Sequence, residues 1–352
     1  MLVTILVFLA LLIILVITHE LGHFTAAKLC KVKVEEFGIG FPPKIFGIKR
    51  GETIYSINAI PLGGFTRLLG EEDPTMPGSL ASKSIPARIF VLSAGSILNI
   101  LLPILLFSIG FMIPHDVTLE KVMIKDVVVG SPAQAAGVEA GDRILSINGH
   151  QVKNRADVSY MIQLNLGSST HMVIQKQDLS EKTITVTPRW NPPQGQGATG
   201  VTLASADSTT ATESLPFWQA VPDSITHSWD ILVLFRNEIL SWFIRGTMPQ
   251  LAGPIAIAQL TGEVVKAGIS PLLEFAALIS INLGIFNLLP FPGLDGGRLI
   301  FVLLEWVRRG KRISPQKEGL VHMIGFIALI VLILIISYFD VARIIHGESL
   351  IP

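Results

Sequence analysis

The sequence has little cysteine and little charge, and each shortage excludes a class of protein. Cys30 is the single cysteine, so the chain cannot form an intrachain disulfide or a cysteine-rich metal site. Charged residues make up 15% of the 352 residues and the formal net charge is zero, which gives no indication of a nucleic-acid partner. Half of the residues are hydrophobic, a composition typical of a membrane protein.

Four long apolar runs predict four transmembrane helices. The first has no Lys or Arg before it and no small-residue cleavage site after it, so we expect a membrane helix and not a cleaved signal peptide. Prolines and glycines interrupt the third, and irregular backbone at membrane depth must be buried in protein or line a wet cavity. The predicted helices cover residues 1–29, 85–114, 269–306 and 319–339.

Two basic segments separate these runs. Lysines and arginines gather in residues 30–84 and in the loop 307–318, so the positive-inside rule places both on the cytoplasmic side of the bilayer. The first segment has the alternation of a membrane-associated β region, with a break in the pattern at residues 61–65. An open strand edge there can pair with an extended substrate backbone, and a small surface hairpin without a substrate role is the alternative. Its strands are predicted at residues 34–41, 44–49 and 53–58.

The rest of the chain predicts a soluble domain and an interfacial segment. Residues 115–204 read as short strands and helices of an α+β domain. Residues 205–224 are rich in Ser and Thr and predict a linker. Residues 225–268 are apolar but interrupted by charge, which favours an interfacial amphipathic helix region over a spanning helix. Residues 340–352 form a short polar tail, and we expect both chain ends and the soluble domain outside the cytoplasm.

His19-Glu20-Leu21-Gly22-His23, at the end of the first apolar run, is the strongest functional signal. On a helix, His19 and His23 are four residues apart and project from one face, so both imidazoles can bind one metal ion. Glu20 stands where its carboxylate can reach an attacking water instead of the ion. Alternatively, the three are interfacial side chains that end a membrane helix. A third metal ligand elsewhere in the chain is needed to decide between a metal site and interfacial side chains.

Asp295 is the candidate for that ligand. It lies in the interruption of the third run, where a carboxylate needs a counter-charge, and a Zn²⁺ held by the histidines supplies one. The predicted topology places Asp295 and His19 in the same, cytoplasmic, half of the membrane. Taken alone, the position of Asp295 favours an N-cap of the next helical segment, and together with the histidine pair it favours a metal ligand.

These motifs resemble those of the site-2 protease family of intramembrane zinc metalloproteases, peptidase family M50. The chain is most similar to the bacterial regulator-of-sigma-E type, in a version with one PDZ domain. His19-Glu20-x-x-His23 and Leu294-Asp295-Gly296 match the two metal-site motifs of the family. Asn287, within Asn-x-x-Pro-x-Pro-x-Leu-Asp-Gly, matches the asparagine with which members hold the substrate. The stretch from Ser131 to Val152 resembles a circularly permuted bacterial PDZ domain.

The resemblance implies a fold and a function. The fold is a polytopic α-helical membrane protein with a β-hairpin region and one extracytoplasmic α+β PDZ domain. The function is that of a zinc metalloendopeptidase in the bacterial cytoplasmic membrane. Its substrates are single-span membrane proteins such as anti-sigma factors or remnant signal peptides. The PDZ groove then holds a peptide or chain end, or the domain only restricts access to the membrane site.

Two other functions are compatible with the motifs. One is a membrane zinc-binding PDZ scaffold or transporter, although a transporter usually has two corresponding helix breaks and this sequence has one. The other is a metalloprotease of another lineage, in which a Glu is the third ligand and Asp295 is dispensable.

Overall fold

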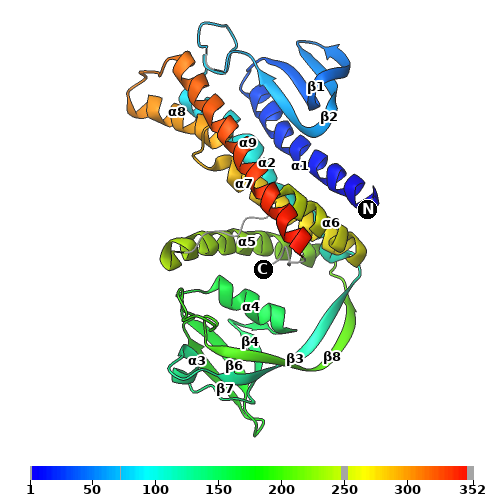
Figure 1. Ribbon diagram of the computed structural model, residues 1–352, viewed down its shortest axis with the longest axis vertical. Helices are drawn as coiled ribbons and strands as arrows, with labels where there is room; N and C mark the ends of the chain where they lie inside the picture. The colour runs from blue at the N-terminus through cyan, green and yellow to red at the C-terminus, as the bar shows by residue number, and fades with distance from the viewer. Residues whose placement is uncertain (1, 72, 247–252, 347–352) are drawn as a thin grey trace. The chain divides into compact units, whose positions relative to one another are not determined.

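The computed structural model describes residues 2–71, 73–246 and 253–346 (Figure 1). The chain divides into two compact units, which we call unit 1 and unit 2. Unit 1 comprises Met1–Gly110 and Gln250–Pro352, and unit 2 comprises Phe111–Pro249.

The helices of unit 1 confirm the prediction of a polytopic membrane protein. Four helices of the described residues are long and apolar enough to cross a bilayer. Two shorter helices, α6 (Pro254–Ala267) and α8 (Asp295–Val307), accompany them. The four long helices are α1 (Leu2–Leu29), α2 (Ile85–Met112), α7 (Ile269–Leu288) and α9 (Pro315–His346).

Two predicted boundaries in unit 1 differ from the structure. The third apolar run is two helices, because α7 ends at Leu288 and α8 begins at Asp295. Helix α9 begins at Pro315 and continues to His346, so residues 340–346 of the predicted tail are helical. Asp340 explains the extension, since its buried carboxylate accepts a hydrogen bond from the backbone N–H of Ala256 near the start of α6.

Helices α1 and α2 approach closely through small residues. A Cβ atom added at Gly22 would lie 2.4 Å from the Ala94 carbonyl oxygen, and one at Gly95 would lie 2.4 Å from His23 Nε2. Such contacts are forbidden to any larger residue at these positions. The Ala94-Gly95-Ser96 segment therefore brings the backbone of α2 against the histidine face of α1.

The β region of unit 1 contains two long strands, β1 (Val34–Arg50) and β2 (Thr53–Leu68). The predicted break at residues 61–65 was wrong, because β2 continues through it. Phe37 of β1 pairs with both Tyr55 and Thr66, so the first half of β1 lies between the two halves of β2. Gly63, with φ of +107°, allows the chain to bend at this point without leaving the sheet. Residues 64–68 form an outer row that has no strand partner on its far side among the described residues.

Unit 2 contains an antiparallel sheet with the strand order β7-β6-β4-β3-β8. Its core is formed by aliphatic residues of the sheet and of α4, among them Ile124, Ile144, Val158 and Ile174. Asn148 and Gly149 both have positive φ, as the predicted Asn-Gly turn requires. The elements are β3 (His115–Val127), α3 (Pro132–Ala135), β4 (Arg143–Ile147), β5 (His150–Gln151), α4 (Arg155–Leu164), β6 (Thr170–Gln175), β7 (Glu181–Val186) and β8 (Val201–Glu213).

The prediction of a linker at residues 205–224 was wrong, whereas the region predicted as helical at 225–268 is helical in its described residues. The expected linker at 205–224 is strand β8 up to Glu213, which pairs with β3, and helix from Phe217 onwards. Threonine is β-branched and fits a pleated surface, so Thr209, Thr210 and Thr212 are compatible with a strand here. The expected interfacial region at 225–268 is two helices, α5 (Phe217–Arg245) in unit 2 and α6 in unit 1. Between them, residues 247–252 lie outside the described part of the chain.

Candidate metal centre

The two histidines lie on one face of α1, as their spacing predicts. Their Nε2 atoms are 3.1 Å apart, and both side chains are buried. His23 is oriented by its other ring nitrogen, because Nδ1 lies 2.8 Å from the Val91 carbonyl oxygen and donates to it. This hydrogen bond fixes the tautomer of His23 and leaves Nε2 as the atom available to a metal.

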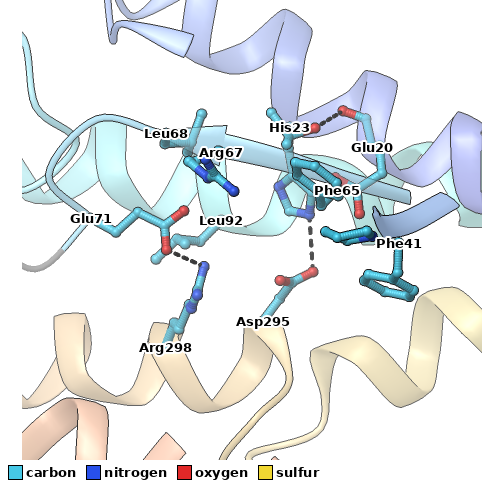
Figure 2. Close-up of a pocket in the computed structure, with 12 residues that line it drawn as sticks. Glu20, His23, Phe41, Phe65, Arg67, Leu68, Glu71, Leu92, Asp295 and Arg298 are labelled. Carbon is cyan, nitrogen blue, oxygen red and sulfur yellow. Dashed lines mark hydrogen bonds and ion pairs between the residues drawn. The ribbon is translucent and has the colours of Figure 1, made fainter. Parts of the chain in front are cut away.

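Asp295 reaches the histidines because the chain breaks between α7 and α8. Its Oδ2 atom lies 3.1 Å from His19 Nε2 and 3.1 Å from His23 Nε2, although it is 272 residues from His23 (Figure 2). The capping alternative does not describe this residue, because Leu294 occupies the N-cap position and Asp295 is the first helical residue.

The turn before α8 depends on the two glycines that follow Asp295. A Cβ atom at Gly296 would lie 2.1 Å from the Leu289 carbonyl oxygen, and one at Gly297 would lie 2.4 Å from that of Phe291. Only glycine permits the start of α8 to return so closely against the segment after α7. This packing holds Asp295 at the histidines.

The three donor atoms fit a zinc ion. Their mutual separations are all 3.1 Å. Tetrahedral ligands at zinc bond lengths of about 2.0–2.1 Å are separated by about 3.3 Å, close to what is seen here. Within the described parts of the chain, this is the one group of three or more His, Cys, Asp or Glu side chains close enough to hold an ion. Two imidazoles and one carboxylate form the donor set of a catalytic zinc site.

Glu20 lies beside this group without belonging to it. Its side chain lines the same cavity as His23 and Asp295. Its backbone carbonyl oxygen accepts a hydrogen bond of 3.1 Å from Thr66 Oγ1 of β2, so the strand and the helix turn that carries Glu20 are joined. A carboxylate in this position can exchange a proton with a molecule held at the three ligands.

The cavity next to the metal ligands has a volume of about 420 Å³. One wall is formed by residues 65–68, which belong to the outer row of β2. The opposite wall is formed by α8 (Figure 2). Arg298, one turn after Asp295, forms an ion pair of 2.7 Å with Glu71 across the cavity. Sequence reasoning missed Arg67, Glu71 and Arg298 as cavity residues. The one available signal was the position of Arg298 directly after the glycines of the motif.

Asn287, the predicted substrate-binding residue, lies in the last turn of α7 and is half-buried. It is not among the residues that line the cavity next to the ligands. Its role therefore stays a prediction.

Comparison with known proteins agrees with this geometry. Residues 7–332 match the profile of peptidase family M50. A Clostridium acetobutylicum relative, whose name refers to a zinc metalloprotease, is 34% identical over 93% of this chain and 94% of its own length. The zinc metalloprotease RasP of Geobacillus kaustophilus is 30% identical over 94% and 95% of the two chains. The regulator of sigma-W protease RasP of Bacillus subtilis is 29% identical over 94% and 96%.

Proposed function

The chain belongs to peptidase family M50 and is a membrane zinc metalloprotease, and from this premise we propose that it hydrolyses peptide bonds in the transmembrane segments of single-span membrane proteins. The observation that carries the proposal is the convergence of His19, His23 and Asp295 in a chain with four candidate membrane helices. A metal centre among membrane helices suits substrates that are themselves embedded in the bilayer.

The proposed roles of the site residues follow from their positions. His19, His23 and Asp295 would hold the zinc ion, which would supply Lewis-acid chemistry to a carbonyl oxygen and to a water. Glu20 accepts the proton of the attacking water and passes it to the leaving amine. The hydrogen bond from His23 Nδ1 to the Val91 carbonyl oxygen holds the His23 ring in place.

The outer row of β2 is proposed to hold the substrate. A transmembrane helix hides its backbone hydrogen bonds, so the segment to be cut must first be unwound. Residues 64–68 present an unpaired strand edge among the described residues, and residues 65–68 also line the cavity of the metal ligands. An unwound segment can add to this edge as a further strand, and main-chain hydrogen bonds then keep it extended next to Glu20. Asn287 is proposed to contact the same segment.

Unit 2 is proposed to be an extracytoplasmic PDZ domain of a protein in the bacterial cytoplasmic membrane. The antiparallel sheet, helix α4 against its core and the Asn148-Gly149 turn support this assignment. The basic segments 30–84 and 307–318 support a cytoplasmic position for the metal centre. The domain restricts access of bulky substrates or receives a peptide segment, and the proposed substrates resemble anti-sigma factors or remnant signal peptides.

The test is Glu20→Gln, assayed in proteoliposomes with a single-span substrate. The variant should lose cleavage by about 100-fold to 10,000-fold, the usual contribution of a general base, and should retain one zinc per chain. Glu35→Gln is the matched control, since Glu35 is an exposed acid of β1. A Glu20→Gln variant that cleaves within twofold of the wild type contradicts the proposal and favours a zinc-binding scaffold.

A further inference from the structure

Unit 2 contains a second cavity, of about 560 Å³, between the start of β3, helix α4 and helix α5. Helix α5 is anchored to α4 by side-chain hydrogen bonds. Asn237 Nδ2 donates to the carbonyl oxygens of Gln163 and Leu164, at 2.8 and 3.1 Å. The Tyr160 hydroxyl lies 3.2 Å from His227 Nδ1 and donates to Asp230 at 3.3 Å. These hydrogen bonds hold α4 and α5 together on either side of the cavity, so the cavity is part of the folded structure of unit 2.

Backbone groups of β3 beside this cavity are occupied at Thr118 and Glu120. One edge of β3 pairs with β8. On the other edge, the Glu120 N–H donates to the Lys153 carbonyl oxygen at 2.7 Å, and the Thr118 carbonyl oxygen accepts from Asn154 Nδ2 at 3.1 Å. These backbone groups are already satisfied, so strand addition at these positions would require breaking both hydrogen bonds. At these two positions of β3 a ligand can be recognised only through its side chains.

The cavity has a strong excess of negative charge. Four carboxylates line it against one lysine. Lys153 is already paired with Glu213. The remaining three, Asp157, Asp223 and Asp230, have no lysine or arginine partner within 4.0 Å in the described part of the chain. Three histidines also line the cavity, His115, His150 and His227, and burial lowers the pKa of His227.

Aromatic rings complete the cavity wall. Tyr160 and His227 are stacked, with ring centroids 5.7 Å apart and an interplanar angle of 24°, and Phe111 packs edge-on against His227. Carboxylates beside aromatic faces are the combination that recognises an ammonium or guanidinium group, by charge and by cation–π attraction. From this charge complementarity we propose that the cavity binds a lysine or arginine side chain of a partner polypeptide. The inference does not depend on the metal centre of unit 1.

The titratable groups predict how binding changes with pH. Burial raises the pKa of Asp230, so this carboxylate loses its charge at a higher pH than an ordinary aspartate. Burial lowers the pKa of His227, which stays neutral until the solution is more acidic. The other titratable groups facing the cavity are His115, His150, Lys153, Asp157, Tyr160, Glu213 and Asp223. Protonation of Asp230 removes a negative charge and protonation of His227 adds a positive one, and both changes weaken binding of a cation.

The experiment uses the full-length, zinc-loaded protein in uncharged detergent and end-capped fluorescent octapeptides. The peptides carry lysines, arginines, glutamates or norleucines at the same three positions, and fluorescence anisotropy gives the affinities. We expect the lysine and arginine peptides to bind at least about tenfold more tightly than the other two. Their affinity should fall as the solution is made more acidic than neutral, because Asp230 loses its negative charge and His227 then gains a positive one.

Three variants locate the binding. Asp157→Asn combined with Asp230→Asn should abolish the preference for the basic peptides, and Asp223→Asn, at an exposed position, should reduce it by about threefold. Asp126→Asn, an exposed aspartate of β3 outside the cavity, should leave it unchanged. Equal affinities for all four peptides, tighter binding of the glutamate peptide, or a preference that survives in both the double variant and Asp223→Asn would overturn the proposal.

Discussion

Gly95→Ala is a small change that should disable the metal centre. The new Cβ atom would lie 2.4 Å from His23 Nε2 and 2.8 Å from the His19 carbonyl oxygen. An ordinary van der Waals contact begins at 3.4 Å, so the His23 ring or the whole of α1 must move by about 1 Å. The ring of His23 has little freedom, because Nδ1 is hydrogen-bonded to the Val91 carbonyl oxygen of α2, the helix that carries Gly95, and Nε2 faces Asp295.

A displacement of this size is large on the scale of a metal site. Misplacing a reacting group by about 1 Å can lower the rate about 100-fold, and disturbing the orientation of a ligand lowers metal affinity about 10- to 100-fold. Alanine is a better helix former than glycine, so the intrinsic stability of α2 should not fall. We therefore expect a folded protein with about 100-fold lower kcat/KM and weaker zinc retention.

The assay is cleavage of a single-span substrate in proteoliposomes, together with zinc content after dialysis against a zinc-buffered solution. Gly110→Ala is the matched control on the same helix, because its Cβ atom would meet Ser270 Oγ at 3.6 Å, an ordinary contact. The reasoning is refuted if Gly95→Ala retains zinc and cleaves within twofold of the wild type, or if Gly110→Ala loses both to the same extent.

Two further predictions concern Asp295 and a buried ion pair. Asp295→Asn keeps the shape of the ligand but removes its charge, so zinc affinity should fall by at least about tenfold in competition with a chelator; an unchanged affinity would exclude Asp295 as a ligand. Arg88 of α2 and Glu305 of α8 form a buried ion pair of 2.6 Å. Glu305→Ala leaves the guanidinium buried without this carboxylate and should destabilise unit 1 by about 3–5 kcal/mol. Thermal unfolding in detergent measures the loss, Glu263→Ala at an exposed position of α6 is the control, and equal melting temperatures would contradict the reasoning.

Features with a local cause were predictable from the sequence. A run of some twenty apolar residues has few alternatives to a membrane helix, and all four candidate helices are present. The four-residue spacing of His19 and His23 places both rings on one helix face whatever the surroundings. Prolines at 290 and 292 end a helix by their own chemistry, so the break that carries Asp295 could be predicted as well.

Features that depend on distant pairing could not be predicted. Nothing within residues 53–68 indicates that the first half of β1 lies between two halves of β2, because that arrangement is decided by contacts across the sheet. Strand β8 was mistaken for a linker for the same reason, since its partner β3 is about 90 residues earlier. Arg298 and Glu71 meet only once α8 has packed beside the β region, so their ion pair has no local signal.

X-ray absorption at the zinc K-edge of the purified full-length protein tests the central claim most directly. The account predicts one zinc per chain with two imidazole nitrogens and otherwise oxygen ligands at about 2.0–2.1 Å, and loss of one imidazole in His23→Ala. A sulfur ligand, a shell with a single imidazole in the wild type, or an unaltered spectrum in His23→Ala would contradict it.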